Sequence, residues 1–419
     1  ALQTALGYKA AAHNEVTDKL DKIEKKLLNA KDISASIESY KSWKEVEKSL
    51  RPGEAIISFM SFEHTDQQEY YGAFLLENGS KPRFLRLGKK QYLDRLFENY
   101  LSQLKKRKFE SILNNTYNSR IYSEVMSPLL SRFGDKTDHL LIVNDGIFSK
   151  VNLGVIMDRQ TESYLFEKYH ILYVNSLKSK IESTLPTKRK RKNIVLVGNP
   201  SYGKGQSVFG KKWSALPGTA EEIQKVRSAF KNTKWKTIVL DEDEASEQNL
   251  FTLSSPSILH IASHGFFISS SNIDTKNSDP LVQGGIVLAH ANDTQNLWGN
   301  NDGYLTAYEL MQLKLDRTEL IVFSACDTGL GEEIRGEGIN GLQRSALSSG
   351  ANSLVMSLWE ANDYFAQQWI RYFYLNYLNG VDTSAISSKT YSDFLSFLPE
   401  ESREIRFNPG AWGNFIFSK

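Results

Sequence analysis

ILHIASHG, residues 258–265, is an apolar run that ends in a His-Gly pair. LIVFSACDTG, residues 320–329, has the same layout, with a cysteine after the apolar run and a glycine shortly beyond it. Short apolar runs bounded by turn-forming residues are typical of strands that are buried on both faces of a sheet. The two stretches therefore predict two buried strands with reactive side chains at their carboxyl ends.

Strands and helices alternate on both sides of these two stretches. We predict strands at 194–197, 237–240, 258–262, 320–324 and 353–357, and helices at 220–230, 307–313, 338–348 and 364–378. Such alternation favours a mostly parallel sheet covered by helices on both faces, that is, an α/β fold. Reactive residues of such folds lie just past the carboxyl ends of the strands.

The first half of the chain is less regular. We predict strands at 55–62, 70–76 and 140–143 and helical segments at 92–109 and 121–133, after a charged, helix-prone stretch with an apolar stripe of Leu20, Ile23, Leu27 and Leu28. The basic run at 188–192 is interpreted as a solvated linker. The expected organisation is a helical segment (1–50), an α/β unit (51–187) and a second α/β unit (193–419).

Composition excludes several classes of protein. The chain has 419 residues, 51 Lys and Arg against 49 Asp and Glu, and one cysteine. A single cysteine rules out an internal disulfide framework and thiolate metal clusters, and the net charge of +2 gives no overall case for nucleic acid or membrane binding. No apolar run reaches the ~18 residues of a membrane span. We expect a cytoplasmic protein with no cofactor, no metal site and no direct nucleic-acid binding.

His264 and Cys326 are the candidate catalytic residues. They lie 62 residues apart, but neighbouring parallel strands would bring their ends together. A thiol needs a nearby base to act as a nucleophile, and imidazole is the usual one. The amides of Gly265 and Cys326 are the candidate oxyanion hole. The alternative is that both side chains are structural, which is the interpretation we prefer for the mid-strand His260.

A nucleotide site is not indicated. GNPSYGKG, residues 198–205, imitates a phosphate-binding loop, but Gly205 stands where the magnesium-binding Ser or Thr is required, and Pro200 removes a cradle amide.

Several longer stretches resemble the CHAT domain, a bacterial relative of caspases and separase. They are ILHIASHGFF (258–267), IVFSACDTGLGE (321–332), GEGINGLQRS (336–345), SLVMSLW (353–359), LPGTAEE (216–222), GYLTAYEL (303–310) and AWGNF (411–415). The resemblance runs from about residue 120 to the end. It implies a caspase-like three-layer α/β/α sandwich and cysteine endopeptidase chemistry, with His264 and Cys326 matching the catalytic positions.

The resemblance also bears on the rest of the chain. The family often follows tetratricopeptide repeats, so residues 1–50 are expected to be a remnant or cap of such a region. Relatives carry an inactive protease-like domain ahead of the active one. Aligning LLIVNDGIF (140–148) with LHIASHGFF (259–267) places Asp145 opposite His264. We therefore predict that residues 51–187 form a pseudo-protease half without catalysis.

Substrate preference is predicted from the segment Ser357-Leu358-Trp359-Glu360, which resembles the caspase segment that helps bind the P1 side chain. With Trp359, the acidic Glu360 and Asp363 would favour a basic P1 residue, and the linker 188–192 then becomes a candidate self-cleavage site. Alternatively, Asn362 or Asp363 simply caps the following helix.

The expected function is cleavage of a protein substrate, controlled by a regulatory partner or an upstream repeat region. The alternative is a catalytically latent caspase-fold module for interaction or signalling.

Overall fold

The structure is a computed structural model. It describes residues 42–105, 111–175, 177, 192–205, 212–267, 280–282, 284–293, 301–325, 332–334 and 338–419. The stripe at residues 20–28, residues 188–191 of the basic linker and Cys326 lie outside these ranges. Among the helices in the described ranges, none is long and apolar enough to cross a membrane.

One large sheet of eleven strands runs through the described part of the molecule, in the order β3-β2-β1-β4-β7-β18-β17-β14-β10-β8-β9. Its strands in chain order are β1 (Glu54–Glu63), β2 (Glu69–Glu77), β3 (Arg83–Lys89), β4 (His139–Val143), β7 (His170–Tyr173), β8 (Asn193–Pro200), β9 (Lys236–Glu242), β10 (Ile258–Ala262), β14 (Leu320–Ser324), β17 (Leu354–Ser357) and β18 (Phe415–Ser418).

The sheet is mostly parallel. The pairs β9–β8, β8–β10, β10–β14, β14–β17, β1–β4, β4–β7 and β7–β18 are parallel, whereas β1–β2, β2–β3 and β17–β18 are antiparallel. The central strands are buried along nearly their whole length, as expected for strands covered on both faces. The predicted α/β fold with a mostly parallel sheet is therefore confirmed.

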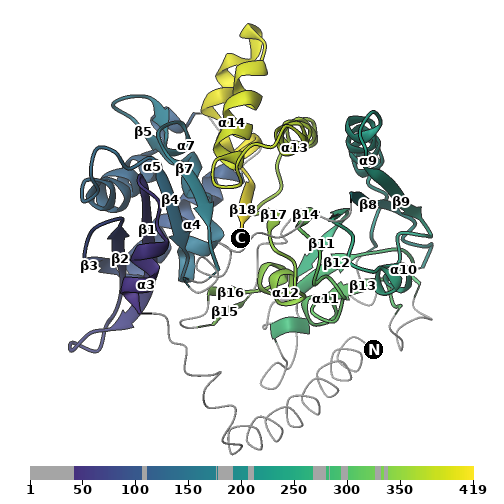
Figure 1. Cartoon of the computed structure of the whole chain (residues 1–419), viewed down its shortest axis with the longest axis horizontal. Coiled ribbons are helices and arrows are strands. Elements are labelled where there is room, and N and C mark those ends of the chain that lie inside the picture. Colours follow the sequence, from purple (N-terminus) through teal and green to yellow (C-terminus); the bar gives the residue numbers. More distant parts are fainter. Residues whose placement is uncertain are drawn as a thin grey trace, which may run out of the picture.

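Helices cover both faces of this sheet. They are α3 (Trp43–Ser49), α4 (Lys90–Leu104), α5 (Thr116–Ile121), α6 (Ser127–Leu130), α7 (Leu165–Lys168), α9 (Pro217–Phe230), α10 (Glu247–Thr252), α11 (Ala307–Leu310), α12 (Leu342–Ser348), α13 (Asp363–Leu378) and α14 (Ile386–Phe397). Figure 1 shows α9, α13 and α14 on one side of the C-terminal half of the sheet and α10, α11 and α12 on the other. The result is a three-layer sandwich.

Smaller sheets lie beside the large one. β11 (Gly265–Phe267), β12 (Gly284–Val287) and β13 (Tyr304–Thr306) form a three-stranded antiparallel sheet directly after β10. Two short hairpins are formed by β5 (Met157–Asp158) with β6 (Ser163–Tyr164) and by β15 (Glu332–Ile334) with β16 (Gly338–Asn340).

The two predicted α/β units share the large sheet, and the chain ends where they meet (Figure 1). Lys419 donates its backbone N–H to the Tyr173 oxygen (2.9 Å), which joins β18 to β7. The buried Asn152 shares the two hydrogens of its Nδ2 among three acceptors, the oxygens of Gly413 (2.9 Å) and Phe415 (3.0 Å) and the Tyr391 hydroxyl (3.1 Å). These contacts fix one unit against the other.

Several predicted helix boundaries are wrong. The helix expected at 307–313 ends at Leu310, and α5 begins at Thr116, before the helical segment expected from residue 121. The helix expected from residue 338 begins only at Leu342, because residues 338–340 form β16 and Gly341 is the N-cap. Glycines disfavour helix interiors, and the sequence between Gly338 and Gly341 does not extend the helical pattern. The strands β3, β7 and β18 and the helix α14 were not predicted. They are short or amphipathic segments whose identity depends on the neighbours against which they pack.

Candidate active site

The carboxyl ends of β10 and β14 meet at one edge of the sheet, as the sequence predicts. The two strands are parallel neighbours with Ala262 opposite Ser324, and the N–H of Ser263 continues the ladder to the Ser324 oxygen (3.3 Å). His264 follows the end of β10, and Ala325 follows the end of β14. Cys326, the next residue, lies outside the described residues.

His264 is partly buried in an aromatic setting. Its ring lies between those of Tyr202 and Trp213, with centroid distances of 5.3 and 5.1 Å. Its Nε2 lies 2.9 Å from the backbone oxygen of Ser214. Because a carbonyl oxygen only accepts hydrogen bonds, Nε2 carries the proton. In the neutral imidazole, Nδ1 is then the basic nitrogen.

The segment that supplies this carbonyl is anchored at the preceding residue, Trp213. The backbone of Trp213 is bonded to the fully buried side-chain amide of Asn292, at 2.9 Å from the Trp213 N–H to Oδ1 and 2.8 Å from Nδ2 to the Trp213 oxygen. The indole N–H of Trp213 donates to the hydroxyl of Tyr304 (2.9 Å). These bonds hold the Ser214 carbonyl in place, and with it the orientation of the imidazole.

Gly265 begins β11 and pairs with Ile286 of β12. The N–H of Val287 donates to the His264 oxygen (2.8 Å). The backbone of the His-Gly pair is therefore fixed by the small sheet that follows it. The predicted oxyanion hole also needs the amide of Cys326, so its geometry remains a prediction.

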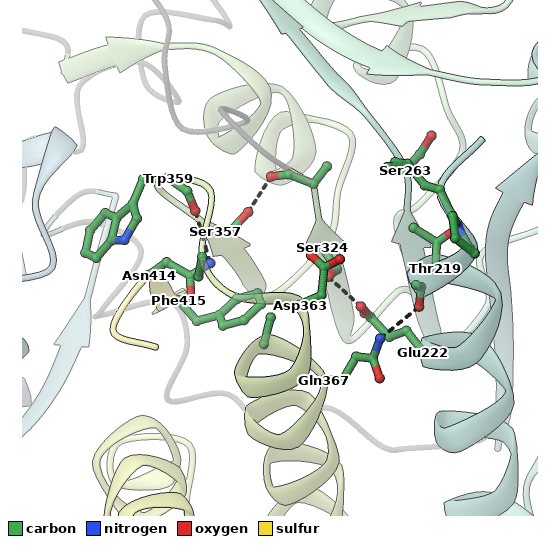
Figure 2. A pocket seen from close by; sticks show the side chains of 16 residues that line it. Thr219, Glu222, Ser263, Ser324, Ser357, Trp359, Asp363, Gln367, Asn414 and Phe415 are labelled. Carbon is green, nitrogen blue, oxygen red and sulfur yellow. Dashed lines mark hydrogen bonds between the residues drawn. The ribbon is translucent and has the colours of Figure 1, made fainter. Parts of the chain in front are cut away.

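A pocket of about 130 Å³ lies at the same sheet edge, and Figure 2 shows the side chains around it. It reaches the ends of β10, β14 and β17 and the first turns of α9 and α13. Its lining comprises Leu216, Pro217, Gly218, Thr219, Glu222, Ser263, Ser324, Ala325, Ser357, Trp359, Ala361, Asp363, Ala366, Gln367, Asn414 and Phe415. Residues flanking both predicted catalytic positions, Ser263 and Ala325, are therefore pocket residues.

The predicted substrate-binding residues have three different settings. Asp363 lines the pocket from the first turn of α13 and is exposed. Trp359 also lines it, but its side chain is fully buried and its indole N–H donates to the Gly410 oxygen (3.1 Å). Glu360 is exposed and is not a lining residue. Asn362 is the N-cap of α13, and its Oδ1 accepts hydrogen bonds from the backbone N–H groups of Tyr364 and Phe365.

A buried hydrogen-bonded network reaches the pocket from behind. His260 is fully buried, with Nδ1 2.9 Å from the Tyr374 hydroxyl and Nε2 2.9 Å from Glu222 Oε1. The other oxygen of Glu222 accepts from the Ser324 hydroxyl (2.9 Å). Because a carboxylate accepts hydrogen bonds, Nε2 of His260 donates to Glu222, and in the neutral imidazole Nδ1 then accepts from the Tyr374 hydroxyl, whose pKa is raised well above its usual value by burial. Tyr374 therefore donates to His260, and His260 donates to Glu222.

Sequence reasoning missed two parts of this site. The Ser214 carbonyl is a backbone group, and no residue type marks it. Glu222 was quoted within LPGTAEE but given no role, although the helical spacing of α9 places it one turn from Thr219, on the same side of the helix. Its bonds to His260 of β10 and Ser324 of β14 form only in the folded chain.

The solved structures to which the chain is similar include the separase–securin complex of Saccharomyces cerevisiae, with 10% sequence identity, a TM-score of 0.47, and 90% of this chain and 30% of that one covered. Another, described as "Structure of Protease", has 10% identity, a TM-score of 0.38, and 77% and 74% covered.

Among curated proteins, the chain is similar to tetratricopeptide repeat protein 28 of mouse and of human. Each is 21% identical, over 59% and 66% of this chain. The chain spans only 11% and 12% of the length of these relatives.

The family model of the CHAT domain matches residues 116–417, which include β10, β14, the pocket and most of the final strand. This match covers well over half of the chain and confirms the resemblance found in the sequence. The chain belongs to the CHAT-domain family.

Proposed function

We propose that this chain is a cysteine endopeptidase whose catalytic dyad is His264 and Cys326. The observation that carries the proposal is the setting of His264. Its imidazole is held by the Ser214 carbonyl with Nδ1 as the basic nitrogen, beside the strand that leads into Cys326. A fixed base next to a thiol is the arrangement that nucleophilic catalysis by cysteine requires.

The proposed reaction has two stages. Nδ1 of His264 takes the proton of the Cys326 thiol, and the thiolate attacks the carbonyl carbon of the scissile peptide bond. The amides of Gly265 and Cys326 stabilise the oxyanion, and the imidazolium protonates the leaving amine as the C–N bond breaks. Water then hydrolyses the thioester, which releases the acid product and the thiol.

A basic P1 residue remains the proposed preference, through Asp363 at the pocket rather than Glu360. Asp363 lines the pocket, whereas Glu360 does not. A carboxylate there would attract an arginine or lysine side chain by charge pairing. Whether residues 188–192 are cleaved by the chain itself is tested by incubating the intact protein.

We also propose that residues 51–187 are an inactive copy of the protease unit. In support, β4 lies between parallel β1 and β7, as β10 lies between parallel β8 and β14. Asp145, opposite His264 in the sequence alignment, is buried and accepts from the Ser61 N–H (2.6 Å). Control by a protein partner or an upstream repeat region is proposed from the tetratricopeptide repeats named in the relatives.

The chain's single cysteine makes the test direct, because alkylation by iodoacetamide reports only on Cys326. We expect the alkylation rate at neutral pH to fall about tenfold or more in His264→Gln, because the base that activates the thiol is lost. His64→Gln, at an exposed histidine far along the chain, is the control and should leave the rate unchanged.

Cleavage is measured with a fluorogenic peptide library. Cys326→Ala should abolish cleavage without changing the thermal unfolding of the protein. Equal alkylation rates in both histidine variants, or cleavage that survives in Cys326→Ala, would contradict the dyad. A reactive thiol without cleavage of any peptide, with and without candidate partners, favours the latent interaction module.

A further inference from the structure

The pocket is lined by Ser263 and Ala325, the residues just before His264 and Cys326, and it presents hydrogen-bond acceptors to whatever fills it. Among the described lining residues, Glu222 and Asp363 are the charged ones, and both are acidic. Figure 2 shows Glu222 reaching from α9 toward Ser324, with Asp363 at the start of α13 nearby. An ionised carboxylate accepts hydrogen bonds and donates none. The pocket is therefore suited to a ligand that carries several donors.

Glu222 is the more deeply placed of these two acids. It is 5% exposed, whereas Asp363 lies at the surface. His260 and Ser324 each donate one hydrogen bond to its carboxylate. Because a carboxylate has about four acceptor positions, these two bonds fix its orientation and leave capacity for a bidentate partner.

A second acceptor at the pocket has no partner of its own. Asn414 is 3% exposed and lines the pocket, and its Nδ2 donates to the Trp359 oxygen (3.1 Å). Its Oδ1 is buried without a hydrogen-bond partner among the described residues. Buried polar atoms are nearly always paired, so the hydrogen bonding of the Asn414 side chain is incomplete in this structure.

The size of the pocket limits the ligand. Its volume of about 130 Å³ is close to that of an engineered protein cavity of about 150 Å³ that binds benzene. Beyond Cβ, an arginine side chain has as many heavy atoms as benzene, and its guanidinium carries five donors in a planar fork. Lysine is smaller and offers a point charge instead of a fork.

We propose that Glu222 selects the P1 side chain, that this side chain is arginine, and that His260 holds the Glu222 carboxylate in position. The inference rests on the proposed function, since a P1 residue exists only if the chain cleaves peptides. It assigns the selecting role that sequence reasoning gave to Trp359, Glu360 and Asp363 to Glu222, while Asp363, at the surface of the same pocket, adds a second carboxylate that attracts the cation.

Two features of the site act against a cation. The first turns of α9 and α13 both line the pocket, and helix N-termini favour anions. However, Asn362 already caps α13, and α9 begins with Pro217, which has no N–H. The second feature is the positive charge of Lys225, which is bonded to the pocket residue Gln367. Its ammonium donates to Gln367 Oε1 and lies 3.5 Å from the Glu221 carboxylate, which balances its charge.

The first experiment compares kcat/KM for peptides that differ only at P1, with arginine, lysine, norleucine or aspartate. We expect arginine to be preferred by the parent protein. In Glu222→Gln the ratio of arginine to norleucine should fall about 10- to 100-fold, because a hydrogen-bonded charge is lost. Glu360→Gln is the matched control and should change this ratio by less than about twofold. Cleavage of the norleucine peptide reports that each variant is folded.

The second experiment needs no cleavage. Agmatine, the decarboxylated form of arginine, is titrated into the Cys326→Ala protein and its binding is measured by ligand-detected NMR. Binding should be lost on adding Glu222→Gln and kept on adding Glu360→Gln. If no peptide is cleaved but agmatine follows this pattern, the proposed function fails and the guanidinium site stands.

Three results would overturn the inference. One is a preference for aspartate at P1, which means that the helix N-termini dominate the pocket. Another is an arginine-to-norleucine ratio that falls in Glu360→Gln or is unchanged in Glu222→Gln. The third is agmatine binding to the Cys326→Ala protein that is equally strong before and after the Glu222→Gln substitution is added.

Discussion

Replacement of His260 by leucine tests the buried network most severely. The imidazole is fully buried and bonded at both nitrogens, at 2.9 Å to Tyr374 and 2.9 Å to Glu222. Leucine is of similar size and fills the space, but it makes neither bond. Glu222 would then keep one donor, Ser324, and the Tyr374 hydroxyl would lose its acceptor.

The expected loss of stability follows from these two bonds. A hydrogen bond to a charged group contributes about 1.5 to 3 kcal/mol, and an orphaned buried hydroxyl costs about 1 to 3 kcal/mol. The sum is about 2.5 to 6 kcal/mol. Because Glu222 lines the pocket, water can replace part of the lost bond, so we expect a value near about 3 kcal/mol.

The assay is urea-induced unfolding, with Tyr374→Phe used to complete a double-mutant cycle. In the parent protein, Tyr374→Phe should cost about 1 kcal/mol, because one neutral bond is lost. In His260→Leu it should instead restore about 1 kcal/mol, because the orphaned hydroxyl is removed. The control His64→Leu, at an exposed site, should stay within about 0.5 kcal/mol of the parent.

A change below about 1 kcal/mol for His260→Leu would refute this account. Additive effects in the cycle, within about 0.5 kcal/mol, would refute it as well, since residues in one network are expected to couple.

Three further predictions concern stability. Burial lowers the pKa of His170, so the unfolded chain binds a proton at this histidine more readily than the folded chain does. The free energy of unfolding should therefore fall as the pH drops below about 6.5. Urea titrations at several pH values should show a flatter pH dependence for His170→Gln. Gly146 has a φ of +56° and Gly79 a φ of +77°, but a Cβ at Gly146 would collide with the Tyr71 hydroxyl, whereas a Cβ at Gly79 would meet nothing within 4 Å. Gly79→Ala should therefore cost only the backbone strain of about 1 to 2 kcal/mol, and Gly146→Ala clearly more; equal costs would contradict the steric argument. Asn152→Ala removes the bonds that join the two units and should cost about 2 to 4 kcal/mol in the same assay, and a loss under about 1 kcal/mol would show that the shared sheet alone holds them.

Most of the large sheet could be predicted from the sequence because its central strands are continuous apolar runs. The strands β8, β10, β14 and β17 are found within one or a few residues of their expected positions. Hydrophobic runs of this kind are a local property, so no tertiary information is needed to find them. By contrast, β18 lies between β7 and β17, strands far apart in the chain, and nothing within its four residues specifies either neighbour.

The candidate site was predictable only in part, for a similar reason. The His-Gly pair at the end of β10 could be found because a strand and a glycine leave a local pattern. The group that orients His264 is the carbonyl of Ser214, 50 residues earlier, and a backbone oxygen has no sequence signature. Likewise, Asp363 lines the pocket while Glu360 does not, although the two are close neighbours in the chain.

The sequence by itself determined the α/β class, the two strands that lead into His264 and Cys326 and, through its motifs, membership of the CHAT-domain family. Only the tertiary structure decided which carboxylate faces the pocket and which nitrogen of His264 is basic. The physical reason is that apolar periodicity is set by each residue's immediate neighbours. The side chains that meet at a sheet edge are set instead by strand order and helix packing, which join residues far apart in the chain.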